Sequence, residues 1–165
     1  MEPVQAITLV EYNTWANHRI LAKVSGLPAS ALTVESFLSH KTLLATLVHI
    51  LDAQWYWREG AQTGALPVNT LTSADFASLQ SLKRRWVKED RLLLEYVKGL
   101  TPATLNGQVS YSWPRARPRT RPLWQLLTHI VNHGTHHRSE LGQYLATLGR
   151  SPGDLDFIKF VSKAQ

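Results

Sequence analysis

The segment PLWQLLTHIVNHGTHHRSELGQYL, residues Pro122 to Leu145, contains four of the seven histidines of this 165-residue chain. Its apolar residues recur at three- and four-residue steps, which predicts an amphipathic helix. Pro122 is suited to the first helical position and Gly149 to a C-cap, so the helix is expected between them. Histidine is a poor choice for plain helical packing. Its density here indicates either a basic surface or a site that uses imidazole nitrogens.

The histidines of this helix fall on different parts of the helical wheel. At about 100° per residue, the apolar arc is centred on a row of five residues. These are Leu123, Ile130, Gly134, Leu141 and Leu148. His137 lies just inside one edge of the arc and His133 on the edge, whereas His129 and His136 lie progressively further toward solvent. Side chains four residues apart are about 5–6 Å apart on one helix face, so His133 and His137 are placed to bind one metal ion.

A candidate third ligand, His49, lies in a second predicted helix from about Ser39 to Glu59, which is apolar on most faces. Its neighbours on the wheel are small residues, with one tyrosine further along the helix. They are Thr42, Ala45, Thr46, Ala53 and Tyr56. Such a face is typical of a cavity wall. Three neutral imidazoles would leave a coordination position open, as in catalytic metal sites. The alternatives are an incidental histidine pair and a core histidine that is only hydrogen-bonded.

The remaining segments predict two further helices, from about Val4 to Val24 and from the N-cap Ser73 to about Gly99. Residues 109–124, VSYSWPRARPRTRPLW, alternate in polarity around a Pro-Arg turn and predict a short hairpin. The tail LDFIKFV, residues 155–161, is expected to pack back on the helices. The predicted fold is all-α, a four-helix bundle in a single domain over residues 1–165, with the hairpin before the last helix.

Five polar residues outside the predicted site also have expected positions. Asn13 and Asn17 lie on or beside the inward stripe of the first helix, so their amides are expected to form hydrogen bonds in the core or to cap the nearby connection. The alternative is a role in the site. His18 and His40 are expected at the surface. Asp52, one turn from His49, is a candidate to orient that imidazole.

Composition excludes several classes of protein. The chain is 44% hydrophobic and 18% charged, which is ordinary for a globular protein. It has no cysteine, so disulfides, zinc fingers and thiol nucleophiles are excluded, and a metal would need nitrogen or oxygen ligands. The N-terminus MEPVQAITLV lacks a basic region and does not resemble a signal peptide. No run approaches the roughly 18 apolar residues of a membrane span. A cytoplasmic protein is expected.

The positive charge is local. Of the formal net charge of +6, four charges come from arginines 115, 117, 119 and 121 of the predicted hairpin. A chain built to coat nucleic acid would spread its basic residues more widely, so the composition argues against that function for the protein as a whole.

Three segments resemble the DinB-like (DinB/YfiT) bundle proteins of bacteria: YNTWANHRIL, LLATLVHILDAQWYW and the histidine-rich helix. The resemblance covers nearly the whole chain and implies an up-down-down-up bundle, usually a homodimer, that binds a divalent ion such as zinc, nickel or iron. The metal triad of the family, one histidine from the second helix and an H-x-x-x-H pair from the fourth, maps onto His49, His133 and His137. Relatives include thiol S-transferases that use bacillithiol, mycothiol-dependent isomerases and transferases, and stress-induced proteins of unknown activity.

Two functions follow as hypotheses. The first is a metal-dependent thiol S-transferase of stress or detoxification, with the thiol supplied as a cosubstrate of the bacillithiol type. In this hypothesis His129 and Tyr56 are candidate catalytic residues, and Arg115, Arg117 and Arg119 are candidates to hold the carboxylates of the thiol. The alternative is a solvated arginine loop. The second hypothesis is a non-catalytic stress-induced protein that binds metal, or nucleic acid through the arginines and Trp113.

Two further expectations concern partners and ligands. A homodimer is expected from the resemblance and from the number of large aromatic residues, which are favoured at interfaces. Those residues are Trp15, Trp55, Trp57 and Trp113. His129 and His136 are not expected to bind the metal, because both lie on the solvent side of the pair formed by His133 and His137.

Overall fold

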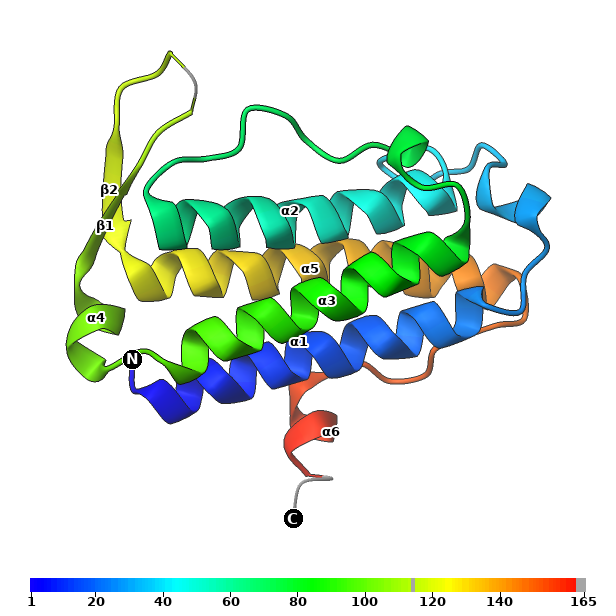
Figure 1. Cartoon of the computed structure of the whole chain (residues 1–165). Coiled ribbons are helices and arrows are strands. Elements are labelled where there is room, and N and C mark those ends of the chain that lie inside the picture. Colours follow the sequence, from blue (N-terminus) through cyan, green and yellow to red (C-terminus); the bar gives the residue numbers. More distant parts are fainter. Residues whose placement is uncertain (114, 163–165) are drawn as a thin grey trace.

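The computed structural model describes residues 1–113 and 115–162, which are mostly helical with one small two-stranded sheet (Figure 1). The long helices are α1 (Pro3–Val24), α2 (Leu43–Thr63), α3 (Leu79–Lys98) and α5 (Leu123–Thr147). They lie side by side, and α1 and α5 run in one direction while α2 and α3 run in the other (Figure 1). Helix α5 packs against α1 and α2, and α3 packs against the same two helices.

Short elements connect and flank the long helices. They are η1 (Ala29–Leu32), η2 (Ser73–Asp75), α4 (Pro102–Asn106), β1 (Gln108–Tyr111), β2 (Arg119–Pro122) and α6 (Phe157–Val161). The hairpin is confirmed, with β1 and β2 antiparallel and Tyr111 opposite Arg119. The tail packs back as predicted, since Phe160 of α6 contacts the rings of Tyr12 and Trp15 on α1. None of the helices in the described residues is long and apolar enough to span a membrane.

Helix α2 begins at Leu43 rather than Ser39 and ends at Thr63 rather than Glu59. The start is displaced because Lys41 adopts a left-handed conformation with φ 66°, which a helix cannot include. Thr42 then caps the helix, and its Oγ1 accepts a hydrogen bond from the Ala45 amide at 3.1 Å. At the other end Gly64, with φ 74°, supplies the left-handed C-cap.

The prediction that Ser73 caps the third long helix is wrong. Ser73 begins η2, a single turn that starts with a capping box between Thr72 and Asp75 and ends at Asp75. The cap of α3 is Ser78, whose side chain accepts a hydrogen bond from the Ser81 amide at 3.1 Å. Either serine satisfies the local rule for an N-cap, so sequence alone did not decide between them.

The apolar core consists of two main clusters with a layer of buried polar side chains between them. On α1, for example, Val10 belongs to one cluster and Ile20 to the other, and Asn13 and Asn17 lie between them in the chain. The same alternation occurs on each of the other long helices. The polar residues there are Gln54 on α2, Asp90 on α3 and Arg138 on α5.

This polar layer forms one hydrogen-bonded network across all four long helices. Arg138 donates from Nη1 to the side-chain oxygens of Asn13, at 2.6 Å, and Asn17, at 2.8 Å. Asn13 donates to Gln54 Oε1 at 2.9 Å, and Gln54 Nε2 donates to Asp90 Oδ1 at 2.8 Å. The expectation that Asn13 and Asn17 hydrogen-bond in the core is therefore confirmed. Because a buried charge must find partners, this network fixes how the four helices sit against one another.

His18, expected at the surface, is half-exposed but also extends the network. Its side chain is 51% exposed, and its Nε2 lies 3.2 Å from Asp90 Oδ2. The hydrogen bond and charge of Asp90 raise the pKa of His18, against the opposing effects of burial and of nearby Lys83.

The four tryptophans expected at a dimer interface have neighbours within the chain. The guanidinium of Arg19 lies 5.2 Å from the Trp15 ring, and Arg85 lies 5.6 Å from the ring of Trp55. Trp57 and Trp113 pack edge-to-face with centroids 6.0 Å apart. These aromatic residues therefore do not require a second copy of the chain, and the homodimer stays a prediction.

We predict that Gly134→Ala destabilises the protein. An added Cβ would lie 2.5 Å from Arg138 Nη1 and 2.8 Å from Asn13 Oδ1, inside the polar network. Alanine normally favours a helix over glycine by about 1 kcal/mol. Overpacking of the network should outweigh that gain and lower the free energy of unfolding by about 1–3 kcal/mol, measured by urea denaturation.

Gly142→Ala is the matched control, because Gly142 lies in the same helix and its added Cβ would meet only Pro152 Cγ at 3.6 Å. That variant should be as stable as the wild type or up to about 1 kcal/mol more stable. Equal stabilities of the two variants would contradict the role assigned to Gly134.

We also predict that the contact between His18 and Asp90 stabilises the fold in a pH-dependent manner. The folded-state pKa of His18 is raised, so the stabilisation is complete below the unfolded pKa of about 6.5 and is lost as pH rises through the folded value. Compared with His18→Gln, the wild type should have the higher melting temperature at pH 5.5, and the difference should shrink toward zero in mildly alkaline buffer. A difference that does not change with pH would contradict this assignment.

Candidate metal centre

Three histidine rings from two helices converge beside the polar network. His49 comes from α2, and His133 and His137 come from α5. The ring centroids of His49 lie 4.8 Å from His133 and 4.7 Å from His137, and those of His133 and His137 lie 4.7 Å apart. The Nε2 atoms of His49 and His133 are 3.0 Å apart. The structure thus brings together the three residues that the sequence selected.

The helical repeat explains this convergence. His133 and His137 are one turn apart on α5, on the stripe next to the one that carries Gly134 and Arg138 into the network. Helix α2 packs along α5, so His49 faces the pair across the contact between the helices. His137 is 6% exposed, whereas His49 and His133 are intermediate in exposure.

His40 is also part of this cluster, although the sequence predicted it at the surface. Its ring stacks on His49 with centroids 3.8 Å apart and lies 5.3 Å from the ring of His137. His40 precedes α2 in a non-helical segment, so helical periodicity gave no information on the direction of its side chain. Its closeness in sequence to the N-cap Thr42 was the one signal that it lies over the start of α2.

A carboxylate lies on the outer side of His137. Glu140 Oε2 is 3.4 Å from His137 Nδ1 and accepts a hydrogen bond from Ser39 Oγ at 2.7 Å. Contact of a carboxylate with Nδ1 fixes the ring and leaves Nε2 as the free donor atom, as in many metal sites. The hydrogen bonds from Ser39 and His137 lower the pKa of Glu140, against the opposing effect of burial.

Asp52 does not have the role proposed for it. Its Oδ1 accepts a hydrogen bond from the Leu71 amide at 2.6 Å and so holds the segment between α2 and η2. Asp52 lies about 60° round the helix from His49, and its hydrogen-bond partner is a backbone amide rather than that imidazole.

The cluster favours neutral imidazoles. Burial, reinforced by the neighbouring histidines, lowers the pKa of His49 to about 4 and that of His133 to about 3. Burial also lowers the pKa of His137, although Glu140 opposes the shift. Neutral imidazole is the form that binds metal ions, so these three side chains need not lose protons to do so at neutral pH.

The geometry of the donor atoms fits a metal ion. Two imidazole nitrogens bound to one ion at about 2.0–2.1 Å are roughly 3.0–3.4 Å apart, and the Nε2 atoms of His49 and His133 are 3.0 Å apart. Two sets of three donors in the described residues lie within 4.8 Å of one another: one is His40, His49 and His137, and the other is His136, His137 and Glu140. Neither set contains His133, whose Nε2 is close to that of His49. His137 belongs to both sets. A metal ion bound by this cluster would therefore lie at the His137 imidazole.

A cavity of about 250 Å³ opens beside the histidines. Its lining includes His49 and His133 at one end and both candidate catalytic residues, Tyr56 and His129. His129 packs edge-to-face on Trp57 with centroids 4.9 Å apart, and burial lowers its pKa. Burial, followed by the charge of Asp52, raises the pKa of the Tyr56 hydroxyl. His129 is consequently a neutral base within the cavity, and Tyr56 is a protonated donor.

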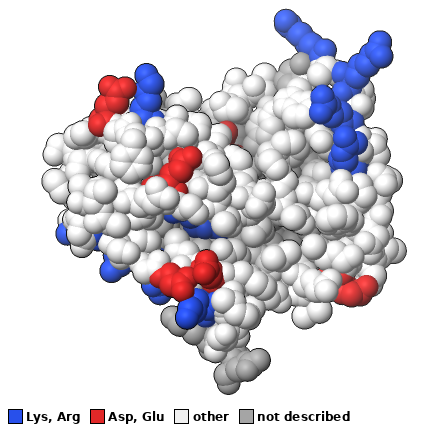
Figure 2. Space-filling view, turned by 180° about the vertical axis from the view of Figure 1, so that it is seen from behind, with Lys and Arg blue, Asp and Glu red and all other residues white. Residues whose placement is uncertain are grey.

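A second cavity, of about 330 Å³, adjoins the first and carries arginine. The two share Trp57, Trp113 and His129 as a common wall. The second is completed by Arg119 and Arg121 of β2, and the Arg119 guanidinium lies 5.2 Å from the Trp113 ring. Lys and Arg side chains gather at the hairpin corner of the molecule, at the upper right of Figure 2.

The hairpin arginines divide into two pairs. Arg119, a predicted cofactor-binding residue, lines the second cavity, and so does Arg121, which was not selected. Arg115 and Arg117 are exposed at the hairpin tip and are not among the residues that line it. Arg115 has a left-handed backbone with φ 63°, and the tip turns away there. The prediction for Arg115 and Arg117 therefore lacks structural support.

His136 and His129 occupy different surroundings from the three central rings. His136 has a side chain that is 70% exposed, and its Nε2 lies 3.4 Å from Glu140 Oε1. His129 lies one turn before His133, with ring centroids 5.8 Å apart. The expectation that neither residue binds the metal stays a prediction.

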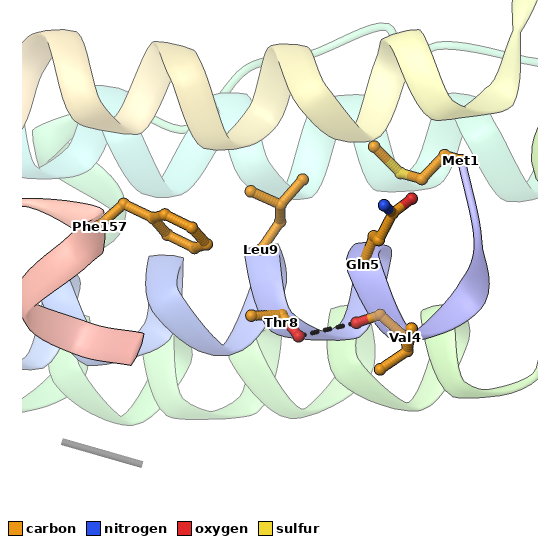
Figure 3. Close-up of a pocket in the computed structure, with 6 residues that line it drawn as sticks. All are labelled: Met1, Val4, Gln5, Thr8, Leu9 and Phe157. Carbon is orange, nitrogen blue, oxygen red and sulfur yellow. Dashed lines mark hydrogen bonds between the residues drawn. The ribbon is translucent and has the colours of Figure 1, made fainter. Parts of the chain in front are cut away.

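Another cavity, of about 400 Å³, lies along the N-terminal part of α1, beside α6 (Figure 3). It is lined by Met1, Val4, Gln5, Thr8, Leu9 and Phe157. These six side chains include no histidine and no carboxylate, and the Thr8 hydroxyl is bonded to the Val4 carbonyl at 2.8 Å. This cavity therefore offers no chemistry comparable to that of the histidine cluster.

Comparison with known proteins agrees with the resemblance noted in the sequence. The model of the DinB family matches residues 1–165. The Protein DinB of Bacillus subtilis (strain 168) is 26% identical over 167 residues, which cover 97% of this chain and 96% of that protein. The chain belongs to the DinB family.

Proposed function

We propose that this DinB-family protein binds a divalent metal ion through His49, His133 and His137 and acts as a thiol S-transferase. The carrying observation is the convergence of three neutral imidazoles, two of which, His49 and His133, line a cavity that adjoins an arginine-lined one. Zinc, nickel and iron are the ions that suit imidazole ligands. Transfer of a thiol sulfur to an electrophilic carbon would place the protein in stress response or detoxification.

The centre suits thiol activation. A divalent ion held by three neutral imidazoles keeps its full positive charge, and would lower the pKa of a thiol at an open coordination position. The chain has no cysteine, so the thiol must be a small molecule. His129, neutral and lining the same cavity, is placed to accept the thiol proton, and Tyr56 is placed to donate a hydrogen bond to a leaving group.

The adjoining cavity suits the rest of the thiol molecule. Arg119 and Arg121 would bind carboxylates by paired hydrogen bonds, which is the recognition that a guanidinium favours. Trp57 and Trp113 line both cavities and would contact the part of the thiol between its sulfur and its carboxylates. This arrangement supports a bacillithiol-type thiol that carries carboxylates at a distance from its sulfur.

A second candidate function is non-catalytic binding of metal or nucleic acid. The stacking of Arg119 on Trp113 is the observation that favours it, since arginine and aromatic residues together bind single strands. Retention on DNA that falls with salt and disappears when the hairpin arginines are changed to alanine would favour this function over the enzyme.

We infer that the four long helices form the up-down-down-up bundle implied by the family resemblance. The directions of the helices in Figure 1 and the long connection that carries the hairpin before α5 support this arrangement. A homodimer is proposed on the same resemblance.

Metal content tests the centre. The protein, purified without a nickel resin, should contain about one divalent ion per chain, and His133→Ala or His137→Ala should abolish binding. Loss of either ligand from α5 breaks the i, i+4 pair on which the ion depends, while the helical fold should survive because the polar network lies on the neighbouring stripe. Elemental analysis gives the metal content, and circular dichroism gives the helicity.

His129→Ala and His136→Ala serve as matched controls on the same helix. Both should keep the ion, because their rings lie outside the three central ones. Loss of the ion from either variant to the extent seen in His133→Ala would refute the three-histidine centre.

Thiol kinetics test the second cavity. With a generic electrophile, the metal-loaded protein should consume a carboxylate-bearing thiol, and removal of the metal should stop the reaction. Arg119→Gln combined with Arg121→Gln should raise the KM for that thiol by about tenfold or more, because each charged hydrogen bond contributes roughly 1.5–3 kcal/mol. The kcat should change little, since the arginines lie away from the sulfur end.

Arg115→Gln with Arg117→Gln is the control for charge alone, because these residues belong to the same hairpin but not to the cavity lining. A thiol without carboxylates should show the same KM with the wild type and with both double variants. An equal rise in KM in both double variants would rule out the cavity as the carboxylate site.

A further inference from the structure

The segment between η1 and α2 places one more imidazole over the three central rings. His40 stacks on His49 with an interplanar angle of 28°, and its donor atoms lie within 4.8 Å of those of His49 and His137. Two other residues of this segment make its apolar contacts: Leu38 is 3% exposed, and Phe37 packs edge-to-face on Tyr144 of α5 with centroids 5.7 Å apart. The contacts of His40 are with the histidine rings.

The segment is folded in a way that holds His40 in this place. Its backbone forms a closed turn, in which the Ser36 amide donates to the Lys41 carbonyl and the Lys41 amide to the Leu38 carbonyl, both at 2.7 Å. Lys41 adopts φ 66°, a conformation that is uncommon for a residue other than glycine. Strain of this kind persists only where the surroundings impose it.

The turn is also tied to the helix that carries the other histidines. Ser39, next to His40, donates from its Oγ and from its amide to Glu140 Oε2, at 2.7 and 3.4 Å. The same carboxylate oxygen is 3.4 Å from His137 Nδ1. One group of α5 thus positions both the ring of His137 and the backbone next to His40.

We propose that His40 is a fourth ligand of the resting metal centre, and that an incoming thiol displaces it. This inference rests on the proposed function, which supplies the metal ion. Imidazoles on one ion have nitrogens roughly 3.0–3.4 Å apart, so the His40 ring turns inward from its stacked position when it binds. Because His40 is on a turn and the other three histidines are on helices, it is the ligand that leaves most easily.

A fourth imidazole gives the centre a protected resting state. It closes the position where the metal would meet water or an unintended anion, and a thiol that binds more tightly than imidazole reopens it. Arg119 and Arg121 would favour this exchange for thiols that carry carboxylates, because such thiols gain contacts in the second cavity as well. His40 would in this way add selectivity to the centre.

Cobalt spectroscopy tests the proposal on the full chain. Co²⁺ takes imidazole ligands as zinc does, and its visible absorption reports the number and kind of ligands. In wild type the spectrum should be that of a four-coordinate ion with nitrogen ligands. His40→Gln and His40→Ala should both change the spectrum to that of a site with water in place of one imidazole, and should weaken Co²⁺ binding by about tenfold or more.

Azide titration provides a second readout. Azide needs an open coordination position, so in wild type it competes with His40 for the metal ion. Its apparent affinity is therefore reduced by the fraction of the protein in which His40 is bound to the ion. Both His40 variants should bind azide at concentrations about tenfold lower than wild type does. His18→Gln is the control, because it removes a histidine that contacts Asp90 rather than this cluster, and it should match wild type in both readouts.

The possible failures are distinguishable. If wild-type protein gives no spectrum of a protein-bound Co²⁺ ion, the metal centre and the role of His40 both fail. If the wild-type spectrum is present and the His40 variants reproduce it with the same azide affinity, His40 only stacks on His49. In that case this inference is overturned, and the three-histidine centre stands.

Discussion

The buried guanidinium of Arg138 is the constraint on which the rest of the structure depends. It is 2% exposed, and a charge in that position is tolerated only when polar atoms surround it. Asn13, Asn17 and Thr135 provide those atoms, and the bonds continue through Gln54 to Asp90. Burial lowers the pKa of Arg138 to about 10, but the side chain still carries its charge at neutral pH. Each of the four long helices therefore has one register that satisfies the network.

This register in turn sets the histidine cluster. Arg138 directly follows His137 in the chain, and Gln54 is five residues after His49 on α2. When Arg138 and Gln54 both reach the asparagines of α1, the neighbouring stripes of α5 and α2 face each other, and the imidazoles meet there. A charged, hydrogen-bonded layer lies directly beside a layer of neutral imidazoles. The first fixes the positions of the helices, and the second remains available for a ligand.

The hairpin and the turn before α2 contribute what the helices do not. β2 places Arg119 and Arg121 around a cavity that shares three aromatic or imidazole side chains with the cavity beside the histidines. The turn places His40 over the cluster from the opposite end of α2. Both segments are short and irregular, and both are anchored: the hairpin by its strand pairing and the turn by Glu140. The helices therefore carry the three central histidines, and anchored connections carry Arg119, Arg121 and His40.

The sequence by itself determined the helical class, because a 3.6-residue repeat places side chains on predictable faces, and the hairpin, because polarity alternates around a Pro-Arg turn. It also selected His49, His133 and His137 as candidate ligands, and their ring centroids lie within 4.8 Å of one another. It also determined that Asn13 and Asn17 would be bonded in the core, since a buried amide must find a partner. Only the tertiary structure decided which serine caps α3, where His40 and Asp52 point, and which arginines line a cavity. Those outcomes depend on contacts between segments far apart in the chain, such as Ser39 with Glu140 and Asp52 with the Leu71 amide. Local periodicity has no information about such contacts, because they form only after the helices have packed.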